Sequence, residues 1–124
     1  MTVVPQGSME EPQELKDRMN TQVASLVREL KEGFRAIYGS RLKGMYLFGS
    51  YARGDQQPDS DVDILVVLDR CDRYAQAVDL SSQLVGELSL KYGVSLSRVF
   101  VSEAEWRGAE TPFLLNAREE AVAV

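Results

Sequence analysis

The residues best suited to chemistry lie in one segment, GSYARGDQQPDSDVD, which runs from Gly49 to Asp63. Gly49 and Ser50 stand where a short apolar run gives way to polar residues. Glycine permits a sharp turn there, and the free N–H groups at the start of a helical turn favour an anion. Arg53 follows Ser50 by three residues, which puts it on the same side of that turn, where it can add a charge-assisted contact. The spacing predicts an anion site.

Two carboxylates, Asp61 and Asp63, close the same segment. They are two residues apart at the start of an expected strand, so both side chains point to one face, with Cα atoms about 6.5–7 Å apart. Such a pair can share a hard cation, and Mg²⁺ prefers a site that substrate phosphates and water complete. The alternative is a pair of solubilising residues at a strand edge. Five apolar residues follow Asp63 and favour a carboxylate that points into a cleft.

Each half of this pattern also has an ordinary structural interpretation. Gly49 and Ser50 alone are typical of a simple turn, and Arg53 has Asp55 and Asp59 nearby as ion-pair partners. The combination of both halves is what indicates a nucleotide with its cation.

Composition removes several classes of catalyst. The 124 residues include no histidine, which excludes Ser–His–Asp and Cys–His catalysis and histidine zinc sites. The single cysteine, Cys71, cannot form an internal disulfide. A net charge of −5 argues against direct binding to duplex nucleic acid. No signal peptide or membrane span is evident, so a cytoplasmic protein is expected.

The elements that must position these residues alternate between helix and strand. Pro12 suits the first turn of a long helix that Gly39 ends, and Val62–Leu68 is apolar on both faces, as in a covered central strand. Asp72 is the expected N-cap of the next long helix. The expected elements are a helix over 11–38, a strand over 43–48, a helical turn over 50–53, a strand over 62–68, a helix up to 92, a strand over 94–101 and short helices over 103–108 and 112–120.

The inward faces follow from apolar spacing. Lys91 and Arg98 are expected to be solvated surface charges, and Trp106, Phe113, Leu114 and Leu115 to complete the core, with a partner-facing role as the lesser alternative. Apolar faces are expected from Leu15, Met19, Val23, Leu26, Leu30, Phe34 and Ile37 in the first helix, and from Ala77, Leu80, Leu84, Val85 and Leu88 in the second.

The pattern GS-x10-DxD with its flanking strands resembles the signature of the DNA polymerase beta-like nucleotidyltransferases. The short chain, the long first helix and the tail TPFLLNAREEA make it most similar to the minimal nucleotidyltransferases (MNT) that accompany HEPN toxins. The resemblance implies an α+β fold, a small mixed β-sheet flanked by helices. It covers nearly the whole chain, with residues 1–10 as a flexible arm and 11–124 as the nucleotidyltransferase domain.

The resemblance also implies roles for individual residues. Gly49, Ser50 and Arg53 bind the phosphates of an NTP, while Asp61 and Asp63 bind Mg²⁺ and are catalytic. The implied reaction moves a nucleoside monophosphate, AMP from ATP, onto a hydroxyl of a partner HEPN toxin, for which the chain serves as antitoxin.

One departure from the family pattern keeps an alternative open. Active members place a third carboxylate on a later strand, but the corresponding segment here, VSLSRVFVS, has Ser95 or Ser97 at that position. Glu103, just past the strand, is the one acidic residue that could substitute. The alternative is therefore a weak or inactive NTP-binding antitoxin that neutralises its partner by forming a complex.

Overall fold

The computed structural model describes residues 12–124, with side chains from Thr21 onward. The expected arm over 1–10, the helix start at Glu11 and the side chains of Leu15 and Met19 lie outside the described residues. The described elements are α1 (Pro12–Tyr38), a short 3-10 turn (Gly39–Arg41), β1 (Leu42–Phe48), α2 (Ser50–Arg53), β2 (Val62–Leu68), α3 (Tyr74–Tyr92), β3 (Leu96–Ser102), α4 (Glu103–Gly108), α5 (Pro112–Glu120) and β4 (Val122–Ala123).

The four strands form one mixed sheet in the order β3-β2-β1-β4. β1 pairs antiparallel with β2 and with β4, whereas β2 and β3 are parallel because α3 carries the chain back across the sheet. β2 is a central strand and all of its residues except Asp63 are buried. The predicted fold class is confirmed.

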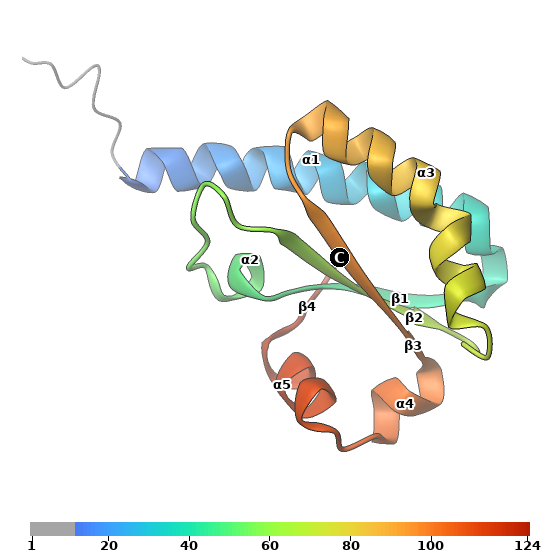
Figure 1. The fold of residues 1–124 in the computed structure, drawn as a ribbon. Helices are drawn as coiled ribbons and strands as arrows, with labels where there is room; N and C mark the ends of the chain where they lie inside the picture. Colours follow the sequence, from blue (N-terminus) through green and yellow to red (C-terminus); the bar gives the residue numbers. More distant parts are fainter. Residues whose placement is uncertain (1–11) are drawn as a thin grey trace, which may run out of the picture.

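Helices cover both faces of this sheet, with α1 and α3 on one side and α4 and α5 on the other (Figure 1). The side chains of β2 alternate between the two layers. Val62, Ile64, Val66 and Leu68 pack with α1 and α3, while Leu65 and Val67 pack with Val101, Leu114 and Ala117 in a smaller cluster. Asp63 has the same parity as Leu65, so it belongs to the α4–α5 side of the sheet.

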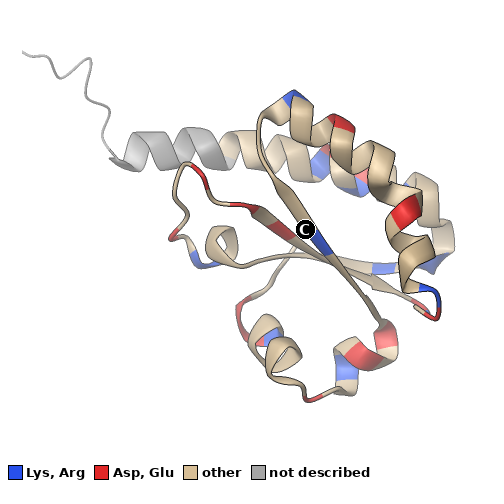
Figure 2. Ribbon diagram, viewed as in Figure 1, with Lys and Arg blue, Asp and Glu red and all other residues tan. Residues whose placement is uncertain are grey.

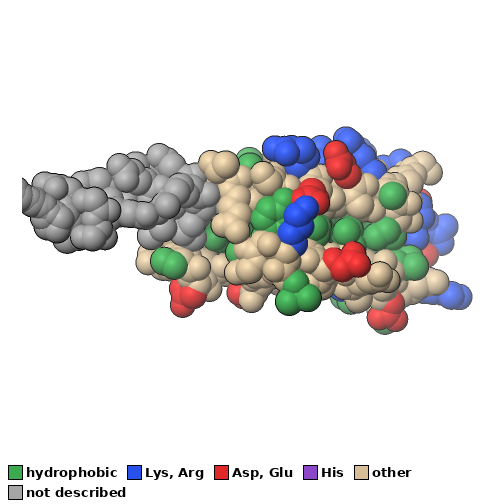
Figure 3. Space-filling model, turned by 90° about the horizontal axis from the view of Figure 1, so that it is seen from above, with side chains coloured by type: hydrophobic (Ala, Val, Ile, Leu, Met, Phe, Trp, Pro, Cys, Tyr) green, Lys and Arg blue, Asp and Glu red, His purple; other side chains and the backbone are tan. Residues whose placement is uncertain are grey.

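The outer surface of the α1–α3 layer is mixed in character. Viewed from above, basic and acidic side chains lie over these helices with hydrophobic side chains between them (Figure 3). The Lys91 ammonium on α3 contacts the Glu29 carboxylate on α1 at 2.9 Å, which ties the two helices together. Among the described residues, no helix is both long enough and apolar enough to cross a membrane.

The start of α3 differs from the sequence expectation. The N-cap residue is Arg73, whose side chain makes no capping hydrogen bond. The Asp72 carboxylate, which was expected to cap this helix, contacts the Arg70 guanidinium at 2.9 Å instead. The buried face of α3 also differs from the face expected from the sequence. Leu80 is 50% exposed, and Ser81 takes the inward position with Ala77, Val85 and Leu88.

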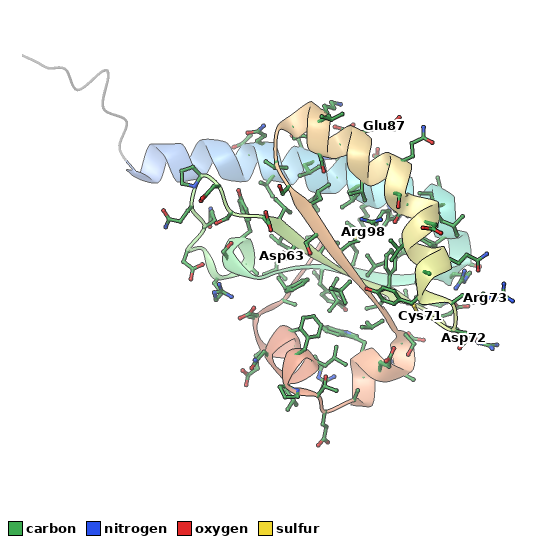
Figure 4. All side chains as sticks on the ribbon, viewed as in Figure 1. Asp63, Cys71, Asp72, Arg73, Glu87 and Arg98 are labelled. Carbon is green, nitrogen blue, oxygen red and sulfur yellow. The ribbon has the colours of Figure 1, made fainter. Side chains whose placement is uncertain are left out.

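Arg98 is the reason a serine can occupy that inward position. Its guanidinium is half-buried under α3 (Figure 4) and donates to Ser81 Oγ at 2.9 Å and to the Val78 carbonyl at 3.0 Å. The expectation of a solvated Arg98 was wrong, since this side chain joins β3 to α3.

Candidate functional site

The turn between β1 and α2 sets the geometry of the candidate site. Gly49 has φ +77° and ψ −153°, a conformation that is essentially restricted to glycine. Its carbonyl accepts from the amides of Ala52 and Arg53, each at 3.1 Å, and Gly54 ends the helical turn with φ +81°. The chain therefore reverses sharply, and the first amides of α2, which have no acceptor within the helix, begin at Ser50.

β2 brings Asp63 to this turn. Asp63 pairs with Phe48 across the antiparallel β1–β2 ladder, which puts its carboxylate beside Gly49. A Cβ added to Gly49 would clash with Asp63 Oδ2, so a side chain at this position would displace the carboxylate. Figure 4 shows Asp63 at the α2 end of the sheet, remote from Cys71, Asp72 and Arg73.

Asp63 lies in an environment that disfavours its charged form. Burial, and then the charge of Asp61, raise the pKa of Asp63, while the Arg53 guanidinium acts in the opposite direction. Asp61 is exposed and precedes β2, where acidic positions stand out at the start of the strand (Figure 2). Two neighbouring carboxylates, one of them half-buried, form a site that a divalent cation would stabilise.

A cavity of about 420 Å³ joins these residues to α5. Of the residues predicted from the sequence, four line it and Asp61 does not. Sequence reasoning missed the other wall, because Phe113 was expected in the core; the detectable signal is the spacing of 113, 116, 117 and 120, one face of a helix. The lining residues are Phe48, Gly49, Ser50, Arg53, Asp63, Phe113, Asn116, Ala117 and Glu120.

Arg53 is engaged by acids on both sides. Its Nε contacts Asp55 Oδ2 at 3.2 Å, as the ion-pair alternative predicted. Its Nη1 contacts Glu120 Oε1 at 3.3 Å, which the sequence did not indicate. The guanidinium is half-exposed and forms one edge of the cavity, so an anion that entered would compete with two carboxylates for it.

Among the described strand residues, no carboxylate stands opposite Asp63 on β3. The residue paired with it on the parallel strand β3 is Ser97, which is exposed. Glu103 cannot substitute, because Ser102 at the end of β3 lies opposite Leu68 at the far end of β2, and Glu103 contacts Arg107 at 3.1 Å. Within residues 21–124, no group of three or more His, Cys, Asp or Glu side chains is placed to hold a metal ion.

Comparison with known families assigns the chain to one of them. The model of the nucleotidyltransferase domain family matches residues 27–118, which contain the glycine–serine turn, both aspartates and most of α5. The chain belongs to the nucleotidyltransferase domain family. The predicted minimal nucleotidyltransferase is thereby confirmed, and the protein is a nucleotidyltransferase enzyme by membership.

Individual relatives agree with this assignment. The chain is 40% identical over 77 residues to MJ0604 of Methanocaldococcus jannaschii, provisionally named a protein adenylyltransferase; the match covers 62% of this chain and 71% of the relative. It is 34% identical over 70 residues to protein adenylyltransferase MntA of Thermococcus cleftensis, covering 56% and 69% of the two chains.

Solved structures share the nucleotidyltransferase fold. A provisionally assigned nucleotidyltransferase of Sulfolobus solfataricus superposes with a TM-score of 0.52 at 24% identity, covering 82% of this chain and 84% of that one. A toxin–antitoxin complex with AMP-PNP superposes with a TM-score of 0.51 at 24% identity, covering 83% and 69%.

Proposed function

We propose that this nucleotidyltransferase moves the adenylyl group of ATP onto a hydroxyl of a partner protein, and that the cavity between α2 and α5 is its active site. The observation that carries this proposal is the juxtaposition of Gly49, Ser50, Arg53 and Asp63 at one cavity. The relatives named protein adenylyltransferases support AMP as the transferred group and a protein as the acceptor.

The residues divide into two roles. The Ser50 hydroxyl and the first amides of α2 hold phosphate oxygens, and Arg53 turns from its carboxylate partners toward the same phosphates. Asp61 and Asp63 hold Mg²⁺, for which their oxygen ligands and their mutual repulsion are suited. The cation, when bound, neutralises charge that develops on the phosphates.

The reaction balances as a simple displacement. An oxygen of the acceptor hydroxyl forms a bond to the α-phosphorus of ATP, and the bond from that phosphorus to the bridging oxygen breaks. The products are the adenylylated protein, pyrophosphate and the proton of the hydroxyl. This chain contributes alignment and charge rather than a covalent intermediate, in line with phosphoryl-transfer enzymes in general.

The partner we propose is a HEPN toxin, for which this chain is the antitoxin. The name MntA of one relative and the toxin–antitoxin complexes among the solved structures of the same fold support a toxin as the partner. The HEPN class follows from the resemblance to the minimal nucleotidyltransferases that accompany such toxins.

A second candidate function is neutralisation by binding alone. The observation that favours it is Ser97, which stands opposite Asp63 without the negative charge of a metal ligand or base. In this version the fold binds ATP and the partner but transfers AMP slowly or not at all.

The deciding experiment combines the protein with α-labelled ATP, Mg²⁺ and the product of the adjacent gene. We expect label on the partner, loss of label with Asp63→Asn, and full labelling with Asp59→Asn, a matched control on the neighbouring exposed loop. Absence of label alongside an active family member would contradict transfer. Growth rescue by folded Asp63→Asn without labelling would establish the binding function instead.

A further inference from the structure

One face of α5 forms the wall of the cavity opposite the glycine–serine turn. Phe113, Asn116, Ala117 and Glu120 follow one another at helical spacing, and all four line the cavity. The small Ala117 side chain, which is buried, leaves space between its larger neighbours. The proposed roles of the β1–α2 turn and the two aspartates do not use this face.

The order of residues along the cavity gives it a direction. At one end Glu120 contacts Arg53, one of the groups proposed to hold the phosphates. At the other end the Phe113 ring packs edge-to-face on Phe48, with centroids 5.6 Å apart, and Phe48 pairs with Asp63, the proposed Mg²⁺ ligand. Glu120 lies seven positions after Phe113, which is a rise of about 10 Å along the helix. A triphosphate laid from Arg53 to Asp63 therefore directs its nucleoside toward the Phe113 end.

Phe113 has the properties of a stacking platform. Its side chain is 42% exposed although it lies at a cavity, so a large apolar ring remains for a ligand to cover. Leu115 on the same helix is equally exposed, at 47%, but is not part of the cavity lining. Stacking on an aromatic side chain is a general way to bind a base, and it does not depend on base identity.

Asn116 can supply the base identity. Its side chain is exposed and makes no hydrogen bond within the described residues. It lies one helical turn after Phe113 and lines the same cavity. A carboxamide offers one acceptor and two donors, which matches the N6 donor and N7 acceptor of adenine. Guanine presents two acceptors at the corresponding positions, and pyrimidines have no N7.

We propose that Phe113 and Asn116 form the nucleobase subsite of this enzyme, with Phe113 stacking on the base and Asn116 selecting adenine. The inference rests on the proposed function, because it takes the phosphate positions from it. The inference adds an origin for the preference among nucleobases, and it places that origin on α5, outside the GS-x10-DxD segment.

Binding measurements test the subsite without relying on transfer. The dissociation constants of ATP, GTP, CTP and inorganic tripolyphosphate, each with Mg²⁺, are measured by calorimetry on the full chain. We expect ATP to bind about tenfold more tightly than GTP or CTP. Asn116→Ala should bring ATP to the affinity of GTP, and Phe113→Ala should weaken all three nucleotides. Tripolyphosphate, which has no base, should bind all variants alike. Leu115→Ala and Glu119→Ala on the same helix are the matched controls, and melting curves confirm that each variant folds.

The outcomes separate this inference from the proposed function. If tripolyphosphate binds and label transfer proceeds, but ATP, GTP and CTP bind equally or Asn116→Ala changes nothing, the base subsite is wrong and the transferase proposal stands. If neither tripolyphosphate nor ATP binds, both are overturned. Equal loss of ATP affinity in Leu115→Ala would also overturn the subsite, because the effect would then come from α5 as a whole.

Discussion

Gly49 meets two constraints at once, a positive φ and direct contact with a carboxylate. We expect Gly49→Ala to lower the free energy of unfolding by about 1–3 kcal/mol, because the backbone conformation there is essentially restricted to glycine. The added methyl group must also displace the Asp63 carboxylate, so nucleotide affinity should fall. Urea unfolding and calorimetry measure the two effects.

Gly86 provides the matched control for this substitution. It lies inside α3, and a Cβ added there meets nothing within 4 Å. Gly86→Ala should therefore stabilise the protein by about 0.5–1 kcal/mol through helix propensity and leave nucleotide binding unchanged. If Gly49→Ala changed neither the free energy of unfolding nor nucleotide affinity, the turn would tolerate a side chain and the Asp63 carboxylate would have space to move.

The raised pKa of Asp63 predicts a pH-dependent gain from removing its charge. Because burial and Asp61 raise this pKa in the folded state, ionisation of Asp63 costs the folded protein stability as pH rises through the folded pKa. In chelator, Asp63→Asn should melt higher than wild type at pH 7. The difference should vanish below about pH 4, the unfolded pKa, where the wild-type carboxyl is protonated in both states. A difference independent of pH would point to packing instead of charge.

At the scale of elements, Arg53–Glu120 is the one ion pair within residues 21–124 that spans the cavity between α2 and α5. Glu120→Gln should tighten ATP binding about two- to fivefold, because it frees Arg53 and removes a negative charge from a site for an anion. Calorimetry with ATP and Mg²⁺ measures this change. Glu119→Gln, exposed and outside the cavity, is the control. Weaker ATP binding in Glu120→Gln would instead make Glu120 a ligand of the nucleotide's cation.

Elements with strong local signals were predictable from the sequence. The Ser102–Glu105 capping box starts α4, and Thr111 with Pro112 starts α5, both as expected, because side chain and backbone satisfy each other within a few residues. The two-residue strand β4 was not predicted. It is too short to show alternation, and it exists because Val122 and Ala123 pair with β1.

The misses in α3 and α5 come from side-chain contacts that capping and periodicity rules do not include. Local rules favoured Asp72 as a cap and Leu80 as an inward residue, but Arg70 takes the Asp72 carboxylate and Arg98 draws Ser81 inward. The Arg70–Asp72 pair is local and competes with the cap, whereas Arg98 lies 17 residues from Ser81 and cannot be assigned to it from spacing. The GS-x10-DxD segment was informative because its residues are close in sequence, whereas Glu120 reaches Arg53 from 67 residues away.

The topology of the whole molecule sets Asp63 beside Ser97, because the parallel pairing of β2 and β3 brings together residues that are distant in sequence. Ser97→Asp should raise the rate of AMP transfer about tenfold or more by supplying a carboxylate for the acceptor hydroxyl. It should also lower the melting temperature in chelator, since three acids then cluster. Ser97→Asn adds a side chain of similar size without the charge, so it should change neither the rate of transfer nor the melting temperature. An unchanged rate in Ser97→Asp, with the lower melting temperature present, would show that a third carboxylate is not what limits transfer.

The two layers around the sheet are unequal. Among the described residues, sixteen buried side chains form the α1–α3 cluster, whereas five form the α4–α5 cluster. Arg118 of α5 donates to the carbonyls of Trp106 and Ala109, which ties α5 to α4 and the turn that follows it. Leu114 and Ala117 pack this layer on the sheet through the small cluster. Such a unit is expected to open as one piece while the rest stays folded.

Amide hydrogen exchange should therefore be faster in α5 than in α3, and it should slow selectively in α5 when ATP and Mg²⁺ occupy the cavity. Equal exchange in both helices would mean that the protein opens only globally. If α5 opens first, the lifetime of this half of the molecule follows the supply of nucleotide: a cell rich in ATP keeps the small layer closed and resistant to proteases, and a starved cell exposes it.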